Sequence, residues 1–181
     1  MIFASMIIIL AWLPLSFEIS QQITTAVATT AQTAELDFVP YSNPTFGIRT
    51  EYPADWGRLD LSFLLNNSAD IDFYPLDDIS GYKHIRIQAE TILSAQSMTL
   101  EQYSSERINS TEGQILGSNS TVLSGLPARE IVFTSMDLRT MQVWTVKDGR
   151  VYAISYIAPE EDFQNDLLIA KRMIESFQII E

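Results

Sequence analysis

The sequence predicts an α+β domain in which helices pack against an antiparallel sheet. Three patterns favour this fold. Apolar and polar residues alternate over 84–93, as they do in a strand with one buried face. An Asp-Gly pair separates two strand-like segments, 138–147 and 150–158, which is typical of a type I′ hairpin. Beyond Pro159, apolar residues recur at the spacing of an amphipathic helix.

The other strands are marked by less regular patterns. The segment 46–52 ends at Pro53, which has no amide hydrogen to contribute to a strand ladder. The segment 57–69 alternates apolar and polar residues, which predicts a strand. Pro75 makes the acidic segment 71–78 a loop or an edge. Two further strands are expected over 114–123 and 128–135, with a turn at 125–127 between them.

Two helices complete the predicted fold. The first covers 100–109, where Thr99 and Gln102 form a capping box. The second begins near Pro159, and the acidic residues 160–162 would then lie at its positive end. Several antiparallel strands with two helices against them give one domain.

An apolar N-terminal segment precedes this domain. Residues 2–17 carry no charge, as in the apolar region of a signal peptide, and Ala-Val-Ala at 26–28 has the form of a cleavage site. We therefore expect a signal peptide or N-terminal anchor over 1–28, a Thr/Ala-rich tether over 29–38 and the folded domain over 39–181; cleavage and retention both remain open. The protein is expected outside the cytoplasm, secreted or at the cell surface or envelope, with membrane contact only through its N-terminal segment.

Charge and cysteine content exclude several classes of function. The formal net charge is -12, so phosphates are repelled and no nucleic-acid partner is expected. The absence of cysteine excludes disulfides, a thiolate zinc site, a cysteine nucleophile and an acyl-cysteine anchor. Asn-x-Ser/Thr sequons support an extracytoplasmic location and make three asparagines candidates for glycosylation: Asn66, Asn109 and Asn119.

Candidate chemistry is sparse. His84 is the sole histidine and no Gly-x-Ser-x-Gly motif supplies a nucleophile, so a solvated histidine at a strand end is expected. Trp56 and Trp144 are expected in the core rather than at a ligand surface. Apart from calcium, no cofactor is indicated. Four aspartates lack the spacing of an EF-hand loop and form either a weak calcium site or a solvated acidic loop: Asp70, Asp72, Asp77 and Asp78.

Several segments resemble PsbP-type domains. Residues 41–56, YSNPTFGIRTEYPADW, resemble the opening of these domains, and 123–131, LSGLPAREI, resemble one of their strands. Residues 151–156, VYAISY, and 170–177, AKRMIESF, resemble their closing strand and helix. The resemblance covers nearly the whole domain. It implies an α/β/α sandwich with a central antiparallel sheet flanked by helices.

The resemblance also implies a class of function. Plant and cyanobacterial members are extrinsic lumenal subunits of photosystem II that help it retain calcium and chloride, whereas other members bind a small GTPase or are envelope proteins. None of the matched motifs is catalytic, so the resemblance implies no functional residue. The targeting segment and sequons of this chain favour a cell-surface or envelope protein over a thylakoid subunit.

Two functions are therefore compared. The first is a non-catalytic extracytoplasmic binding or assembly module that contacts a protein partner at or outside the membrane and binds calcium weakly. The alternative is an extracytoplasmic hydrolase or other enzyme with an unrecognised site. A deep pocket containing carboxylates of perturbed pKa would favour the enzyme.

Overall fold

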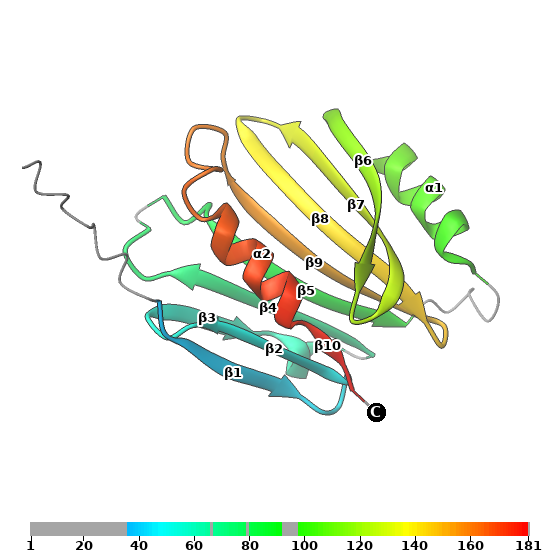
Figure 1. Cartoon of the computed structure of the whole chain (residues 1–181), viewed down its shortest axis with the longest axis horizontal. Helices are drawn as coiled ribbons and strands as arrows, with labels where there is room; N and C mark the ends of the chain where they lie inside the picture. Colours follow the sequence, from blue (N-terminus) through cyan, green and yellow to red (C-terminus); the bar gives the residue numbers. More distant parts are fainter. Residues whose placement is uncertain (1–35, 66, 79, 92–97, 181) are drawn as a thin grey trace, which may run out of the picture. The chain divides into compact units, whose positions relative to one another are not determined.

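A seven-stranded antiparallel sheet forms the centre of the domain (Figure 1). The computed structural model describes residues 36–180 apart from 66, 79 and 92–97. The strands of this sheet are β3 (Trp56–Asp60), β4 (Ser68–Pro75), β5 (His84–Thr91), β6 (Gln114–Leu123), β7 (Leu126–Ser135), β8 (Leu138–Lys147) and β9 (Arg150–Pro159). Their order across the sheet is β3-β4-β5-β9-β8-β7-β6, so β3 and β6 are its edges.

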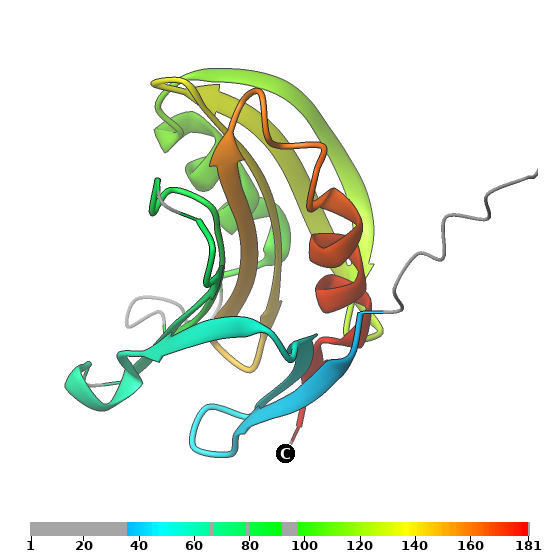
Figure 2. The ribbon, with the colours of Figure 1, turned by 90° about the vertical axis from the view of Figure 1, so that its left-hand side faces the viewer.

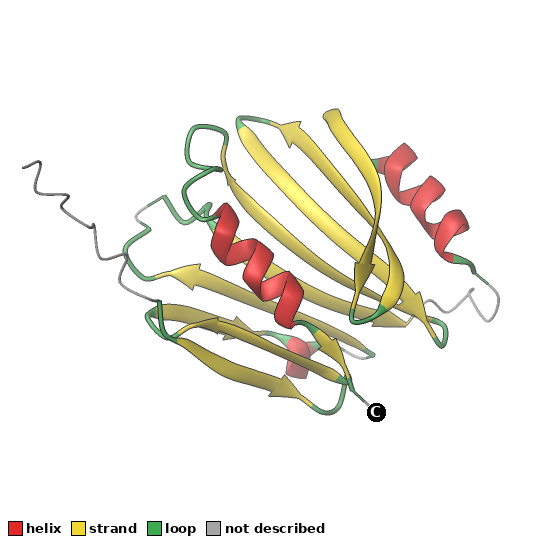
Figure 3. Cartoon of the chain, viewed as in Figure 1, coloured by secondary structure: helices red, strands yellow, loops and turns green. Residues whose placement is uncertain are grey.

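Two helices, α1 (Leu100–Ser110) and α2 (Leu167–Ser176), lie on opposite faces of this sheet (Figure 2). A second sheet of three strands contains β1 (Phe38–Asn43), β2 (Ile48–Pro53) and β10 (Gln178–Ile179), in the order β1-β2-β10. Helix α2 packs against β2 and β9, whereas α1 packs against β7. The predicted α+β fold, an α/β/α sandwich around an antiparallel sheet, is confirmed (Figure 3).

The main core lies on the face of the large sheet that α2 covers. Every second residue of β5 points into it, so Ile85, Ile87 and Ala89 are fully buried, as the alternation predicted. Met173 of α2 is fully buried in the same core. A smaller core around the fully buried Trp144 lies under α1. Trp56 and Trp144 are both buried, as expected.

The hairpin prediction is confirmed residue by residue. Met141 pairs with Tyr156 and Val146 with Val151 across β8 and β9. Asp148 and Gly149 have φ values of 51° and 71°, the positive values that a type I′ turn requires. The capping box of α1 is present as well, because Thr99 and Gln102 exchange hydrogen bonds of 2.9 and 3.2 Å. The turn before β7 is Ser124-Gly125, one residue earlier than expected.

The predicted strand over 57–69 is wrong beyond Asp60. The chain leaves the sheet there and forms a 3-10 turn, η1 (Ser62–Leu64), before β4 begins. The cause is local: the amide of Ser62 donates to Oδ1 of Asp60 at 3.0 Å, and the Ser62 hydroxyl accepts from the amide of Asp70 at 3.3 Å. Such side-chain bonds compete with a strand ladder.

The acidic segment 71–78 was predicted to be a loop or an edge, and this is wrong for residues 71–75. Strand β4 continues to Pro75 and lies between β3 and β5. Ile71 and Phe73 are fully buried, and this apolar side of the strand outweighs the signal from the proline. Proline ends the strand rather than excluding it.

The second helix begins at Leu167, later than predicted. Residues 160–165 form consecutive turns instead, and the amide of Asp162 donates to the Pro159 carbonyl at 3.0 Å. Phe163 is buried against the ring of Tyr156, whose hydroxyl donates to the Phe163 carbonyl at 3.1 Å. The acidic residues 160–162 therefore do not cap the helix, and Glu160 pairs with Arg139.

The signal peptide or anchor predicted over 1–28 lies outside the described residues. Strand β1 begins at Phe38, beside the predicted start of the domain at residue 39. Within 36–180, without the gaps named above, no helix combines the length and apolar character needed to cross a membrane.

Candidate functional site

Asp70 and Asp72 lie on the face of β4 that points away from the main core. Arg86 of β5 donates to both oxygens of Asp72, with Nε to Oδ1 at 2.8 Å and Nη2 to Oδ2 at 3.0 Å. Its Nε also lies 3.5 Å from Oδ1 of Asp70. Burial raises the pKa of Asp70, and Arg86 beside it acts in the opposite direction. These two aspartates are thus part of a half-buried ion-pair cluster and not of a solvated loop.

Asp77 and Asp78 follow β4 and have separate surroundings. Asp77 is exposed. Asp78 accepts hydrogen bonds from the amide and hydroxyl of Ser80, at 3.0 and 2.6 Å, and from the amide of Lys83 at 2.8 Å. Burial raises the pKa of Asp78, but these hydrogen bonds outweigh burial and lower it overall. Asp78 therefore orders the loop that leads into β5.

Calcium binding stays a prediction for these four aspartates. Across the described residues, no three His, Cys, Asp or Glu side chains are grouped as metal ligands. We expect calorimetric titration to give a calcium Kd no tighter than about 0.1–1 mM, with weaker binding in Asp77→Asn/Asp78→Asn. A magnesium titration is the control. A micromolar calcium site would contradict this expectation.

His84 opens β5, as predicted, and its side chain is partly buried rather than fully exposed. Its Nε2 atom is buried and has no hydrogen-bond partner among the described residues. Burial lowers the pKa of His84, so the neutral imidazole is favoured. The neighbouring Lys83 pairs with Asp166 at 3.1 Å. A position at a strand end does not show whether a side chain is exposed, so the burial of this atom could not be inferred from the sequence.

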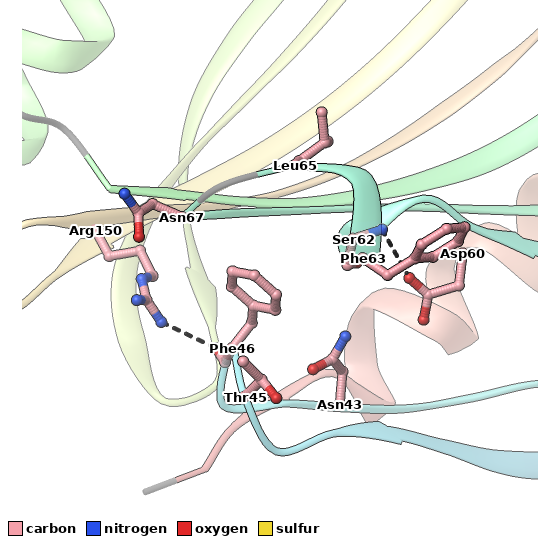
Figure 4. A pocket seen from close by; sticks show the side chains of 9 residues that line it. All are labelled: Asn43, Thr45, Phe46, Asp60, Ser62, Phe63, Leu65, Asn67 and Arg150. Atoms are coloured by element: carbon pink, nitrogen blue, oxygen red, sulfur yellow. Dashed lines mark hydrogen bonds between the residues drawn. The ribbon is translucent and has the colours of Figure 1, made fainter.

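A pocket of about 600 Å³ lies between three chain segments (Figure 4). The turn between β1 and β2 contributes one side, the segment after β3 another, and the start of β9 the third. The lining residues are Asn43, Thr45, Phe46, Asp60, Ser62, Phe63, Leu65, Asn67 and Arg150. Amide, hydroxyl, charged and apolar groups therefore surround one open cavity.

The two charged groups of the pocket are held by neighbouring groups. Asp60 accepts hydrogen bonds from the Tyr41 hydroxyl at 2.6 Å and from the Ser62 amide at 3.0 Å. Burial raises the pKa of Asp60, but these bonds outweigh it, so its pKa lies below the usual range. Arg150 donates to the Phe46 carbonyl at 3.4 Å and lies over the Phe46 ring, 5.7 Å from its centroid. The carboxylate of Asp60 is therefore ionised at neutral pH.

Apolar side chains project into solvent beside this pocket. We call Phe63, Leu64 and Leu65 the apolar rim; these side chains are 80%, 66% and 40% exposed. The apolar rim was not predicted, because its residues fit the alternating pattern of the strand expected over 57–69. One feature of the sequence could have indicated a turn there: Asp60 lies two residues before Ser62, and an aspartate side chain can accept a hydrogen bond from the amide two residues later.

Among the described residues, neither the four aspartates nor His84 lines this pocket. Asp70, Asp72, Asp77, Asp78 and His84 all lie elsewhere. The structure joins Asp70 and Asp72 through Arg86, and His84 lies near enough for both carboxylates to affect its pKa.

Comparison with known proteins identifies the family. A family model described as PsbP-like protein matches residues 1–179. The chain belongs to the PsbP-like family. The family resemblance inferred from 41–56 and 123–131 is thereby confirmed. No curated protein sequence matches this PsbP-like chain.

Solved structures share the PsbP-like fold at low sequence identity. Cyanobacterial PsbP (CyanoP) from Synechocystis sp. PCC 6803 has a TM-score of 0.56 and 12% identity, over 82% of this chain and 95% of that chain. LpqN of Mycobacterium tuberculosis, described as involved in cell envelope biogenesis, has a TM-score of 0.51 and 17% identity, over 81% of this chain and 92% of that chain. These matches support the fold of the PsbP-like domain.

The candidate glycosylation sites of the PsbP-like domain have different surroundings. Asn66 lies outside the described residues. Asn109 is exposed in the last turn of α1. Asn119 is exposed in the middle of β6, not at the end of an element. Glycosylation of all three stays a prediction.

Proposed function

We propose that this PsbP-like domain is a non-catalytic binding or assembly module that works outside the cytoplasm and holds a protein partner. The observation that carries the proposal is the apolar rim beside the open pocket. Phe63 and Leu64 are 80% and 66% exposed although they are neighbours in sequence. Clustered exposed apolar side chains next to a cavity are typical of a protein-binding surface.

The pocket suits a polypeptide partner. Asn43, Thr45 and Asn67 offer amide and hydroxyl groups that pair with backbone groups, whereas the apolar rim takes an apolar side chain. The domain is strongly acidic, with a net charge of -12 for the chain. A partner surface with basic residues around an apolar centre would complement it and associate faster.

The chemistry of the pocket favours binding over catalysis. A general acid or base works best when its pKa lies near the operating pH. The pKa of Asp60 is lowered, so this carboxylate stays ionised and does not exchange a proton near neutrality. His84, the sole histidine, does not line the pocket. An extracytoplasmic hydrolase remains the alternative that an activity screen would reveal.

The extracytoplasmic location rests on the sequence. Residues 2–17 carry no charge and have the length of the apolar region of a signal peptide. LpqN, which is similar in fold, is described as involved in cell envelope biogenesis. A location at the cell surface or envelope, with the N-terminal segment cleaved or kept as an anchor, agrees with both.

Co-purification from native membranes, followed by mass spectrometry, tests this function. We expect the full chain to retain a specific protein, and Phe63→Asp/Leu65→Asp to weaken that association about 30-fold, the effect of losing a binding hot spot. Folding should be unaffected because both side chains are exposed.

Matched variants separate the apolar rim from charge alone. Met136→Asp/Leu168→Asp adds the same charge at two side chains that are 88% and 79% exposed elsewhere on the domain. This control and His84→Ala should retain the partner. Equal loss in the rim variant and in the control would contradict the proposed site.

A further inference from the structure

Strand β6 is an open edge of the large sheet. It pairs with β7 on one side, and no strand of the described chain pairs with its outer side (Figure 1). The strand is ten residues long, and all but three of its residues are exposed. An edge of this length presents a row of unpaired backbone donors and acceptors, which is a template for another strand.

The edges formed by β1 and β3 carry features that block pairing, whereas β6 carries only a bulge between Ile115 and Gly117, near its start. Strand β1 contains Pro40, and β3 has only five residues, which include the charged Arg58 and Asp60. Proline, charge and shortness are the usual protections of edge strands. In contrast, β6 reads QILGSNSTVL, with neither proline nor charge.

Strand β6 also lies within a long uncharged segment of the domain. The chain contains 34 charged residues, 11 basic and 23 acidic, yet 113–128 contains none. Two copies of a chain with net charge -12 repel one another over most of their surfaces. The uncharged β6 edge is therefore where two copies can approach closely.

We propose that two copies of this chain pair through β6, antiparallel across a two-fold axis, and join their sheets into one. If Asn119 of one copy lies opposite Asn119 of the other, then Ser118 of each copy lies opposite Ser120 of its partner, because the residue numbers of opposite positions in an antiparallel pair have a constant sum. The same register sets Gly117 opposite Thr121, and the bulge between Ile115 and Gly117 marks the end of the regular pairing. Small and polar residues therefore meet along the paired segment.

This pairing and carbohydrate at Asn119 exclude each other. Asn119 lies on the two-fold axis of the proposed pair, where a glycan would hold the two strands apart. Glycosylation of Asn119 would therefore convert the proposed dimer into monomers.

Cysteine cross-linking in the full chain tests the pairing, because the chain has no cysteine of its own. Opposite residues of antiparallel strands have Cβ atoms about 4.5–5.5 Å apart, close to the separation that a disulfide spans. Oxidation of Asn119→Cys in native membranes should therefore give covalent dimer. Ser42→Cys, an exposed serine on β1, is the control and should give about ten-fold less.

A second pair of variants shows whether β6 itself makes the contact. In the Asn119→Cys background, Ser118→Lys/Ser120→Lys places like charges opposite one another and should reduce cross-linking to the Ser42→Cys level. Ser118→Thr/Ser120→Thr, which favours strand pairing, should preserve it. Cross-linking that persists with the lysines, or that Ser42→Cys equals, would overturn the proposal.

Discussion

Replacing Trp144 with alanine is expected to lower the free energy of unfolding by about 3–5 kcal/mol, the usual cost of emptying a large buried aromatic site. Trp144 is fully buried in the core beneath α1. Its Nε1 donates to the hydroxyl of Ser104 at 3.0 Å, and the ring of Tyr103 meets it edge-on with centroids 6.2 Å apart. The substitution thus removes a buried packing contact and a hydrogen bond between α1 and the sheet.

Equilibrium urea denaturation followed by circular dichroism measures this loss. Trp144→Phe keeps an aromatic ring but leaves the buried Ser104 hydroxyl without its donor, so it should cost about 1–3 kcal/mol. Leu168→Ala, on an exposed side chain, should change stability by less than about 0.5 kcal/mol. If Trp144→Ala lowered the free energy of unfolding by less than about 1 kcal/mol, α1 would not be packed as described.

Replacing Arg86 with methionine is expected to cost about 1–2 kcal/mol at neutral pH, since it leaves Asp70 and Asp72 facing each other without a cation. The figure is kept low because the Arg86 side chain is 37% exposed and water screens the charges. Methionine retains much of the aliphatic stem, so the change reports mainly on the charge. Urea denaturation at pH 7 measures it, and Arg49→Met, at an exposed position of β2, is the control.

The pH dependence of this effect has a definite sign. Arg86 lowers the pKa of Asp70, so its removal raises that pKa further above the value in the unfolded chain. A carboxyl whose folded-state pKa is raised binds protons more readily when folded, and its destabilisation is relieved as the pH falls through that pKa. The stability difference between wild type and Arg86→Met should therefore shrink from pH 7 to pH 4. A constant difference would show that the lost contacts are not electrostatic.

The sequence predicted those parts of the fold that depend on residues close together in the chain, such as a turn and a helix cap. The Asp148-Gly149 hairpin follows from the positive φ values at its turn, and the capping box of α1 from residues three positions apart. The start of α2 was missed because Phe163 has helical spacing but is held by Tyr156, on a different strand. Helical spacing alone does not distinguish a helix from a turn anchored by such a contact.

The pocket could not be predicted from the sequence, because tertiary packing brings its lining residues together. Asp60 and Arg150 line one pocket although 90 positions separate them in the chain (150 minus 60). Likewise, the contact between Asp72 and Arg86 depends on the register of β4 and β5. The four aspartates lie within nine positions of the sequence, yet they form two separate pairs. Two lie on β4 and contact Arg86, whereas the other two lie in the loop that follows.

The most direct test of the proposed function places one thiol in the pocket. Thr45→Cys is exposed, lines the pocket and leaves the apolar rim intact, and the chain has no other cysteine. A membrane-impermeant maleimide that carries a photo-cross-linker should label it in intact cells and join it to a different protein. Ser105→Cys, exposed on α1, should be labelled without forming that adduct. Labelling of Thr45→Cys only after cell lysis, or labelling with no more adduct than Ser105→Cys gives, would contradict an extracytoplasmic module that binds its partner at the pocket.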